Sequence, residues 1–345
     1  MAKNKLALII AVIFLVLFIL LPAIAKKFGF LGNDNNSSDS DNKTPVVIVG
    51  AIPPSALDLA ARVIVDKAWD KEAGFRLELR PIFPEASVPA ITGGTVDIIG
   101  MSPLSAVRLV NDQKPVKFIA NGLKVDCPFF VNRESSTKSW QDLRGKKLGT
   151  TSETGPSFTT FQVVMKAKEG IDVDKYFKIS HSSFAELIPR LLKGEIDGAY
   201  GRCSEVGIAQ ATEDAGFKTI GNIKDILFRD GEFKELMTDG VVASTGWVNA
   251  NYDLAIKFQD TLYRAYGYIK EHPEIYDDPE IRKAYALEEA KAEVLNKIKE
   301  LVPGFYTFVD WQQLVEDQYK FFEIAQKEGL LDKLPSKEEL FLLPR

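Results

Sequence analysis

Short apolar runs alternate along this chain with stretches in which apolar residues recur every three or four positions. From residue 45 the run PVVIVGAI predicts a strand, and the spacing in SALDLAARVIVDKAWDKEAG (55–74) predicts a helix after it. The alternation continues through FRLELRPIF (75–83), ASVPAITGG (86–94), VDIIGM (96–101), PLSAVRLV (103–110) and VKFIANGL (116–123). This order is typical of a parallel sheet with helices on both faces.

The same alternation begins again near residue 128. It runs through PFFVNRE (128–134), SWQDLRGKKLGTT (139–151), GPSFTTFQVVMKAKEG (155–170), YFKISHS (176–182), FAELIPRLLKGE (184–195), IDGAYG (196–201) and FKTIGNI (217–223). We expect GVVASTGWV (240–248) to be a strand that returns to the first set, and helices to follow it, one of them over 280–302. The pattern therefore predicts two lobes, made of 45–125 with 222–345 and of 126–221, joined by crossings near 125–128 and 222–239.

One phrase occurs twice, one hundred positions apart. Gly94–Asp97 reads GTVD and Gly194–Asp197 reads GEID, and each stands between a helical pattern and a short apolar strand. The spacing is too long for a solenoid repeat, which recurs every 20–50 residues or so. The repetition predicts two lobes that are built on one plan.

The N-terminal segment contains twenty consecutive residues without a charge, from Leu6 to Ala25. A helix of this length spans about 30 Å, the thickness of the hydrocarbon core of a bilayer. We expect residues 1–27 to be a transmembrane anchor, or a signal segment cleaved after Ala25. Residues 28–44 are polar and lack periodicity, which predicts a flexible tether. Both alternatives place the body of the protein outside the cytoplasm.

Composition and charge exclude several classes of function. The chain has 345 residues, which suggests about two domains, and a net charge of −5 without a strongly basic block. This balance argues against nucleic acid as a partner. Only two His and two Cys are present, so metal clusters and Cys-His catalysis are disfavoured, and no cofactor is expected.

Three phrases and the helical tail are similar to those of solute-binding proteins of ABC importers. The phrases are GGTVDIIGMSP (93–103), SWQDLRGKKLGTTSETGPSF (139–158) and KGEIDGAYG (193–201). The resemblance covers roughly residues 45–329, and it is greatest to the group for sulfonates, nitrate, taurine and thiamine-precursor pyrimidines. It implies the α/β periplasmic type II binding fold, with two lobes, each a mixed, mostly parallel sheet flanked by helices, and a helical C-terminal region.

The resemblance also implies a function. A monomeric protein of this kind captures a small organic solute in the cleft between its lobes by hinge closure. It then presents the solute to an ABC permease and its ATPase, and here the N-terminal segment would hold it at the membrane.

Ligands of open α/β sheets bind outside the carboxyl ends of the strands, so the loops there supply the candidate ligand-binding residues. In the first lobe these are Pro53, Pro54, Ser55, Glu85, Ser102 and Ser105. In the second lobe they are Thr151, Glu153, Thr154, Gly155, Ser157, Tyr200, Arg202 and Glu205. Helix N-termini in these loops favour an anion. Acidic residues nevertheless outnumber basic ones there, which favours a hydrogen-bonding or cationic solute.

In this fold the strands near Cys127 and Cys203 should be antiparallel neighbours. The resemblance thus implies a Cys127–Cys203 disulfide, which an exported protein can form. The alternative is two buried free thiols that behave as small apolar residues.

Two other classes of function stay open. Some menaquinone-pathway enzymes use this fold, and Glu153 or Glu205 could act there as a general base if burial raised its pKa. Export of the body argues against this alternative. A tethered sensor or scaffold without a transporter would need the same closing cleft.

Overall fold

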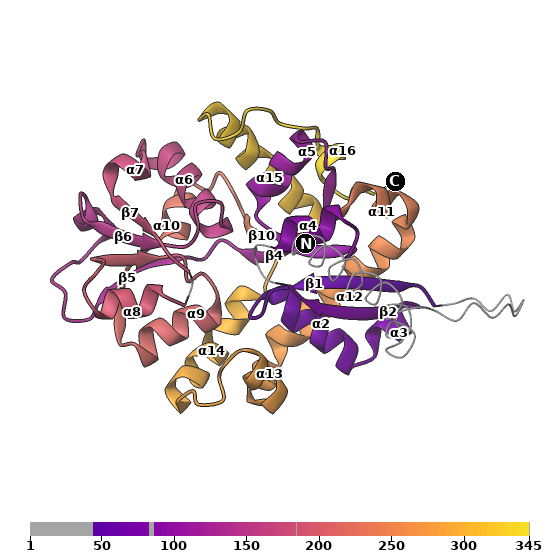
Figure 1. Ribbon diagram of the computed structural model, residues 1–345, viewed down its shortest axis with the longest axis horizontal. Coiled ribbons are helices and arrows are strands. Elements are labelled where there is room, and N and C mark those ends of the chain that lie inside the picture. The colour runs from indigo at the N-terminus through magenta and orange to yellow at the C-terminus, as the bar shows by residue number, and fades with distance from the viewer. Residues whose placement is uncertain (1–43, 83–85, 184, 345) are drawn as a thin grey trace, which may run out of the picture. The chain divides into compact units, whose positions relative to one another are not determined.

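The computed structural model describes residues 44–82, 86–183 and 185–344, and within them two five-stranded sheets (Figure 1). The first sheet has the order β2 (Arg76–Pro81), β1 (Val46–Ala51), β3 (Ile98–Met101), β10 (Met237–Ser244), β4 (Val116–Lys124). The second has the order β7 (Lys178–His181), β6 (Lys147–Thr150), β8 (Gly198–Tyr200), β5 (Pro128–Asn132), β9 (Phe217–Asn222). We call the first sheet and its helices lobe one, and the second sheet and its helices lobe two.

The two sheets have the same construction. In each, the first three strands in the order are parallel, and the fourth and fifth run antiparallel to their neighbours. The strand that returns to lobe one, β10, lies inside the first sheet between β3 and β4. The predicted fold class is therefore confirmed, while the residue boundaries of the lobes stay predictions.

Helices flank both sheets and fill the C-terminal region. Between the strands of lobe one lie α2 (Ala56–Asp66), α3 (Trp69–Glu72), α4 (Ser87–Thr92) and α5 (Pro103–Asn111). Lobe two contains η2 (Trp140–Leu143), α6 (Pro156–Glu169), α7 (Val173–Tyr176), α8 (Leu187–Leu192), α9 (Glu205–Ala209) and η3 (Gln210–Asp214). The rest of the chain forms α10 (Ile223–Leu227), α11 (Thr245–Ala250), α12 (Tyr252–Glu271), η4 (Pro273–Asp277), α13 (Pro279–Ala284), α14 (Ala292–Phe305), α15 (Trp311–Lys327) and α16 (Lys337–Leu340).

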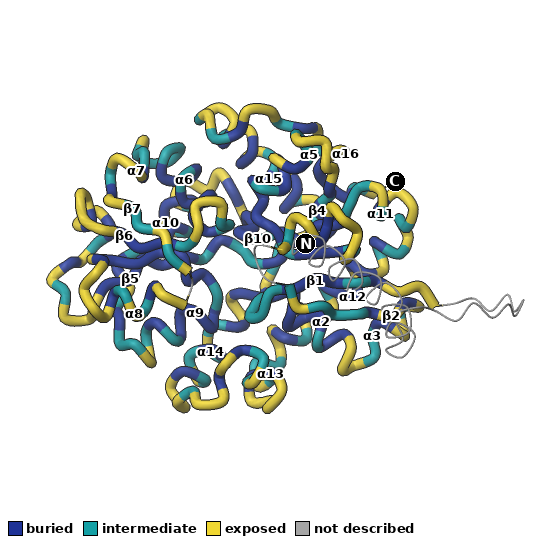
Figure 2. The backbone as a smooth tube through the Cα atoms, viewed as in Figure 1, coloured by how far each residue is buried: buried dark blue, intermediate teal, exposed yellow. Residues whose placement is uncertain are grey.

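Burial follows the alternation of apolar residues from which the elements were predicted. Figure 2 shows inner strands of both sheets, such as β1 and β5, mainly in blue and the outer turns of the helices in yellow. Val47 and Val49 on β1 are fully buried, as are Leu59 and Ile64 on the inner face of α2. Burying each such aliphatic side chain contributes roughly 1.5–3 kcal/mol, so these faces fix how α2 packs on its sheet.

The repeated phrase has one structural role in both lobes. Asp97 precedes β3, and its carboxylate accepts a hydrogen bond of 2.8 Å from the backbone N–H of Ile48 on β1. Asp197 precedes β8, and its carboxylate accepts a bond of the same length from the N–H of Lys147 on β6. In both cases the aspartate's own N–H donates to the carbonyl of that partner residue. The aspartate thus fastens the third strand in the order of each sheet, β3 or β8, to the second, β1 or β6.

Removal of either aspartate should therefore cost stability. We expect Asp97→Ala and Asp197→Ala each to lower the free energy of unfolding by about 1–2 kcal/mol, because a backbone N–H loses its acceptor. Urea unfolding followed by circular dichroism measures this change. Asp260→Ala, at an exposed position on α12, is the control and should change stability by less than about 0.5 kcal/mol. Equal stabilities of all three variants would contradict the role assigned to the phrase.

Three predicted elements are wrong in detail. The helix expected over 55–74 breaks at Ala68, which adopts a left-handed conformation with φ of 55°. The break lets Trp69 pack edge-on against Tyr268, with ring centroids 5.7 Å apart. The helix expected over 280–302 is divided into α13 and α14, since Ala286 is also left-handed. Both breaks depend on long-range packing that local periodicity does not show.

The strand expected over 240–248 is shifted. It starts at Met237 and ends at Ser244, where the Ser244 hydroxyl accepts a hydrogen bond of 3.2 Å from the N–H of Trp247 and caps α11. The second crossing therefore ends before residue 237, and Asp239 belongs to a central strand of the first sheet. The position of Asp239 on β10 is relevant to the candidate functional site.

A small polar network ties the two crossings between the lobes together. The Asp126 carboxylate accepts hydrogen bonds from Asn222 Nδ2 at 2.6 Å and from Lys224 Nζ at 2.5 Å. The side-chain oxygen of Asn222 accepts a bond of 3.0 Å from the N–H of Cys127. The segments between β4 and β5 and after β9 are thus held side by side.

No helix in residues 44–82, 86–183 and 185–344 is long and apolar enough to cross a membrane. The predicted anchor or signal segment (1–27) and nearly all of the predicted tether (28–44) lie outside the described residues.

Candidate functional site

A cavity of about 300 Å³ lies where the two lobes face each other. Lobe one contributes Ala51, Ile52, Pro53, Pro54, Ser55, Leu57, Gly100, Leu123, Thr238 and Asp239. Lobe two contributes Pro156, Ser157, Gly201, Cys203 and Ser204. Most of these residues follow the carboxyl end of a strand or begin the next helix, which is where ligands of α/β folds bind.

The wall from lobe one is formed where β1 leads into α2. The peptide bond between Pro53 and Pro54 is cis. Ser55 follows and caps α2, because its hydroxyl accepts a hydrogen bond of 3.2 Å from the N–H of Asp58. Asp58 also forms an ion pair of 2.8 Å with Arg62, so the first turn of α2 already carries a paired carboxylate.

The wall from lobe two is formed by the starts of α6 and α9. The hydroxyls of Ser157, in the first turn of α6, and Thr151 lie 2.9 Å apart. Ser204 caps α9 by accepting a bond of 3.1 Å from the N–H of Gly207. Gly201, at the end of β8, has φ of 119°, and a Cβ there would lie 3.0 Å from the Thr151 side chain. Glycine at this position lets the backbone approach Thr151 closely.

Asp239 on β10 places a carboxyl group in this cavity. The pairing of β10 with β4 is irregular on both sides of Asp239, and such bulges re-aim side chains near functional sites. The strands on both sides of β10 have a glycine next to Asp239, Gly100 on β3 and Gly122 on β4. A Cβ at Gly100 would lie 3.1 Å from one carboxylate oxygen, and a Cβ at Gly122 would lie 3.0 Å from the same oxygen. Three strands together therefore make room for this carboxyl group.

The Asp239 carboxyl group has no compensating partner among the described residues. It forms no hydrogen bond or ion pair with them, although it is only partly exposed. Withdrawal from water raises the pKa of Asp239 to about 7. Sequence reasoning missed this residue because it placed Asp239 in a crossing. The available signal was a single acid in a run of small and apolar residues (MTDGVVAS).

Of the fourteen residues predicted to bind a ligand, Pro53, Pro54, Ser55 and Ser157 line the cavity. Thr151 supports Ser157, and Gly155 is the N-cap of α6. Glu153 and Thr154 are exposed, and Glu85 lies outside the described residues. Neither Ser102 nor Ser105 is among the lining residues; both form hydrogen bonds between the lobes instead.

Tyr200 and Arg202 point away from the cavity. The Tyr200 ring is buried between Phe129 and Phe161, with centroid distances of 5.0 and 4.5 Å. The Arg202 guanidinium donates to the carbonyl of Gly207 at 3.0 Å and to the side-chain oxygen of Gln210 at 2.5 Å. Burial lowers the pKa of Arg202 to about 10. The Tyr200 ring contacts and these two hydrogen bonds of Arg202 lie within lobe two.

Glu205 joins lobe two to the C-terminal helices. Its carboxyl group is buried and accepts hydrogen bonds from the hydroxyl of Tyr276 and, at 3.4 Å, from that of Tyr306. Burial raises the pKa of Glu205. The helix α9, which begins at Glu205, packs against α14. The sequence assigned residues 222–345 to lobe one, and within them α14 contacts α9 of lobe two as well as α12.

Cys127 and Cys203 form a disulfide in the structure, with Cα atoms 4.3 Å apart. Cys127 precedes β5 and Cys203 follows β8, and these strands are antiparallel neighbours. Because Cys203 lines the cavity, the disulfide also fixes one part of its wall.

On one side of the cavity, hydrogen bonds connect the lobes directly. The hydroxyls of Ser102 at the start of α5 and Thr159 on α6 lie 3.2 Å apart, and the Ser105 hydroxyl donates to the Thr154 carbonyl at 3.4 Å. We expect Ser102→Ala to weaken solute binding about fivefold, because it destabilises the closed arrangement by about 1 kcal/mol. Isothermal titration calorimetry measures this change. Thr92→Val, which removes a bond within α4, is the control, and equal affinities would contradict the expectation.

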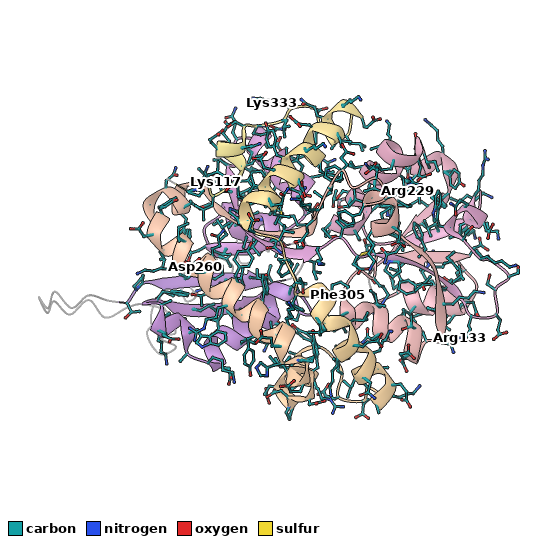
Figure 3. All side chains as sticks on the ribbon, turned by 180° about the vertical axis from the view of Figure 1, so that it is seen from behind. Lys117, Arg133, Arg229, Asp260, Phe305 and Lys333 are labelled. Atoms are coloured by element: carbon teal, nitrogen blue, oxygen red, sulfur yellow. A yellow bond between two sulfur atoms is a disulfide. The ribbon has the colours of Figure 1, made fainter. Side chains whose placement is uncertain are left out.

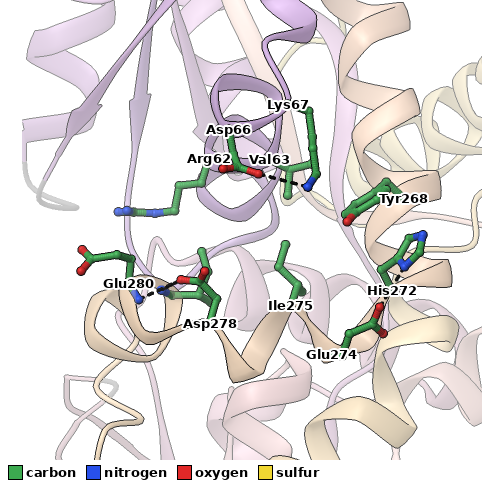
Figure 4. Close-up of a pocket in the computed structure, with 11 residues that line it drawn as sticks. Arg62, Val63, Asp66, Lys67, Tyr268, His272, Glu274, Ile275, Asp278 and Glu280 are labelled. Carbon is green, nitrogen blue, oxygen red and sulfur yellow. Dashed lines mark hydrogen bonds and ion pairs between the residues drawn. The ribbon is translucent and has the colours of Figure 1, made fainter.

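A second pocket of about 350 Å³ lies at the outer face of lobe one (Figure 4). Its basic side chains each have an acidic partner, and Asp278 accepts hydrogen bonds from the backbone N–H groups of Glu280 and Ile281. Lys67 is 3.2 Å from Asp66, His272 is 2.9 Å from Glu274, and Arg62 pairs with Asp58. Paired surface charges of this kind need no ligand. The cavity between the lobes is therefore the better candidate site.

The chain belongs to the NMT1/THI5-like family. The sequence profile of that family matches residues 63–275, which is more than half of the chain. Comparison of the sequence with curated proteins finds no match.

Solved structures with this fold include several solute-binding proteins. The periplasmic aliphatic sulphonate-binding protein SsuA from Escherichia coli is 12% identical, with a TM-score of 0.64, and the match covers 86% of this chain and 96% of that one. A putative periplasmic sulfonate-binding protein from Methylobacillus flagellatus KT is 18% identical, with a TM-score of 0.62 and coverage of 87% and 92%. The alkanesulfonate-binding SsuA from Xanthomonas axonopodis pv. citri, bound to MOPS, is 13% identical, with a TM-score of 0.61 and coverage of 86% and 96%. The resemblance found in the sequence is thus confirmed for family and fold.

Proposed function

We propose that this protein is an extracytoplasmic solute-binding protein that captures a small organic molecule between its lobes and delivers it to an ABC permease and its ATPase. The cavity between the lobes is the observation that carries this proposal. Both lobes contribute walls to it, so a bound solute would stabilise the closed arrangement of the two lobes.

Closure has a structural basis in this chain. Two crossings connect the lobes, and the Asp126–Asn222 hydrogen bond holds them side by side. Rotation about these crossings would separate Ser102 from Thr159 and open the cavity. The backbone changes needed for such a motion are confined to a few residues at the ends of elements.

The proposal is for binding without chemistry. Glu153 and Glu205, the acids considered as a general base, are respectively exposed and hydrogen-bonded to tyrosines outside the cavity. Asp239 is the acid in the cavity, and we assign it a role in solute recognition. Family and fold alone do not distinguish a transporter's receptor from a tethered sensor, because function depends on the site and its partners.

Thermal unfolding of the purified chain with a panel of solutes tests this proposal. The panel contains sulfonates, nitrate, pyrimidines, amino acids and organic amines. At a concentration one hundred times the Kd, a solute adds about 2.7 kcal/mol to the free energy of unfolding and raises the midpoint by a few degrees. Mass spectrometry of the stabilising solute should show no conversion. Turnover of that solute would favour an enzyme and contradict the proposal.

A further inference from the structure

We propose that the solute held in the cavity carries a protonated amine, or another compact organic cation, which binds the Asp239 carboxylate. This inference rests on the proposed function and adds the chemical class of the ligand. The charged groups that face the cavity support it.

Asp239 is the one ionisable side chain among the described residues that line the cavity, with Cys203 held in the disulfide. The other polar side chains there are the hydroxyls of Ser55, Ser157, Ser204 and Thr238. None of these groups can neutralise a carboxylate.

The basic side chains closest in sequence to the cavity walls are engaged elsewhere. Lys124, next to Leu123, donates to the carbonyl of Thr307 at 2.7 Å. Arg202, between Gly201 and Cys203, donates to the carbonyl of Gly207 at 3.0 Å. Figure 3 shows Arg133 at the outer margin of lobe two, and Arg229 is exposed and pairs with Glu169 at 2.5 Å. A partly buried carboxylate without a cation is costly, so the missing positive charge is best supplied by the solute.

The backbone around Asp239 is arranged to keep this carboxyl group in place. Gly100 and Gly122 flank it on the two neighbouring strands, and a Cβ at either position would approach one carboxylate oxygen to 3.1 or 3.0 Å, closer than an ordinary contact. Thr238 beside it is also held, because its hydroxyl donates to the carbonyl of Lys124 at 3.2 Å. Three neighbouring strands thus leave room for this carboxyl group, which favours a role for it in the cavity.

An anion is a poor match for the same cavity. Its oxygens would approach the Asp239 carboxylate, and like charges at contact repel each other strongly at a site of low dielectric constant. The helix starts offer little compensation. Pro156 at the start of α6 has no N–H, and α2 already carries the Asp58 carboxylate in its first turn. The serine hydroxyls bring no positive charge: that of Ser157 is hydrogen-bonded to Thr151, and that of Ser55 accepts from the N–H of Asp58.

The remaining walls limit the body of the ligand. Ile52, Pro53, Leu57, Leu123 and Pro156 present apolar surface to the cavity. The volume of about 300 Å³ is at the lower end of the range for small-molecule sites, roughly 300–1,000 Å³. The geometry therefore points to a compact amine with an apolar body.

Calorimetric titration of the purified chain tests the inference with matched probes. The amines are isobutylamine, benzylamine, putrescine and choline. Benzyl alcohol, isethionate and benzenesulfonate are the neutral and anionic counterparts. We expect at least one amine to bind wild type, and Asp239→Asn to lose at least one hundredfold in affinity for it. Glu235→Gln changes another buried carboxyl group, which does not line the cavity, and is the matched control with unchanged affinity.

The pH dependence gives a second readout. Below pH 7 the affinity for the amine should fall as pH falls, by up to tenfold per pH unit, because Asp239 becomes protonated. The elements packed against β10 include β3, β4, α4, α5, α6 and α11. Of their titratable groups and those of α12, Tyr266 is the one in the described residues whose charge interacts with that of Asp239, and its raised pKa keeps it neutral in this range. The affinity of Asp239→Asn should therefore be independent of pH.

Several results would overturn the inference. Binding of a sulfonate or of benzyl alcohol in preference to every amine would refute it and leave the proposed function standing. An amine that binds wild type and Asp239→Asn equally would also refute it. If no probe binds at 10 mM, the amine class is wrong as stated, and a response to another member of the wider solute panel then decides the proposed function separately.

Discussion

Loss of the disulfide should lower the free energy of unfolding by roughly 2–5 kcal/mol. The double variant Cys127→Ser/Cys203→Ser removes a cross-link between residues 76 positions apart in sequence. This link joins the segment before β5 to the end of β8, so it fixes an antiparallel pair at the centre of the second sheet. Without it the unfolded chain gains conformational entropy, and the Cys203 part of the cavity wall is no longer tied to the crossing.

Urea unfolding with and without dithiothreitol measures this effect. Wild type should lose stability in reductant, whereas the double variant should not respond. Thiol counting in denaturant without reductant should find no free thiol in wild type. Two free thiols, together with equal stability of both proteins, would contradict the disulfide.

The Asp239→Asn variant should be more stable than wild type at pH 8, by roughly 1–3 kcal/mol. Burial raises the pKa of Asp239 from 3.8 to about 7, so the folded protein binds a proton more tightly than the unfolded chain. The stabilising contribution of this group is fully present below about pH 4 and is lost as pH rises through 7. Asp239→Asn does not lose this contribution as pH rises. The curves of the free energy of unfolding against pH should therefore separate for wild type and the variant between pH 4 and 7.

Thermal unfolding from pH 4 to pH 8 measures the separation. Glu235 is also buried with its pKa raised to about 7. Glu235→Gln should therefore also avoid the decrease in the free energy of unfolding that wild type shows as pH rises. Parallel curves for wild type and Asp239→Asn would show that the carboxyl group is not desolvated. If the same substitution stabilises the fold and abolishes amine binding, Asp239 is kept for its function at a cost in stability.

The sequence pattern predicted the strands and the two-lobed plan well, because both depend on local periodicity. Buried strands such as β1 and β5 are short apolar runs. The repeated phrase was informative for a similar reason, since Asp97 and Asp197 serve the same backbone contact in each lobe. Helix breaks at Ala68 and Ala286 were missed because tertiary packing imposes them.

The candidate site was predicted less completely than the fold. The residues at the first strand end and the start of α6, including Ser55 and Ser157, line the cavity. Tyr200 and Glu205 do not. Side chains alternate in direction along a strand, and Glu205, in the first turn of α9, faces Tyr276 and Tyr306 instead of the cavity. Asp239 depends on glycines in two other strands, at positions 100 and 122, and no local pattern connects them.

One measurement tests most directly whether solutes bind between the lobes. Leu123 lines the cavity and is only partly buried, so Leu123→Trp should fill it, whereas Val65→Trp adds the same group at an exposed position on α2. We would record the thermal unfolding midpoints of wild type and both variants against the full solute panel. We expect that a solute which stabilises wild type and Val65→Trp by several degrees has no effect on Leu123→Trp. Equal stabilisation of all three proteins would place the binding site elsewhere and contradict the account.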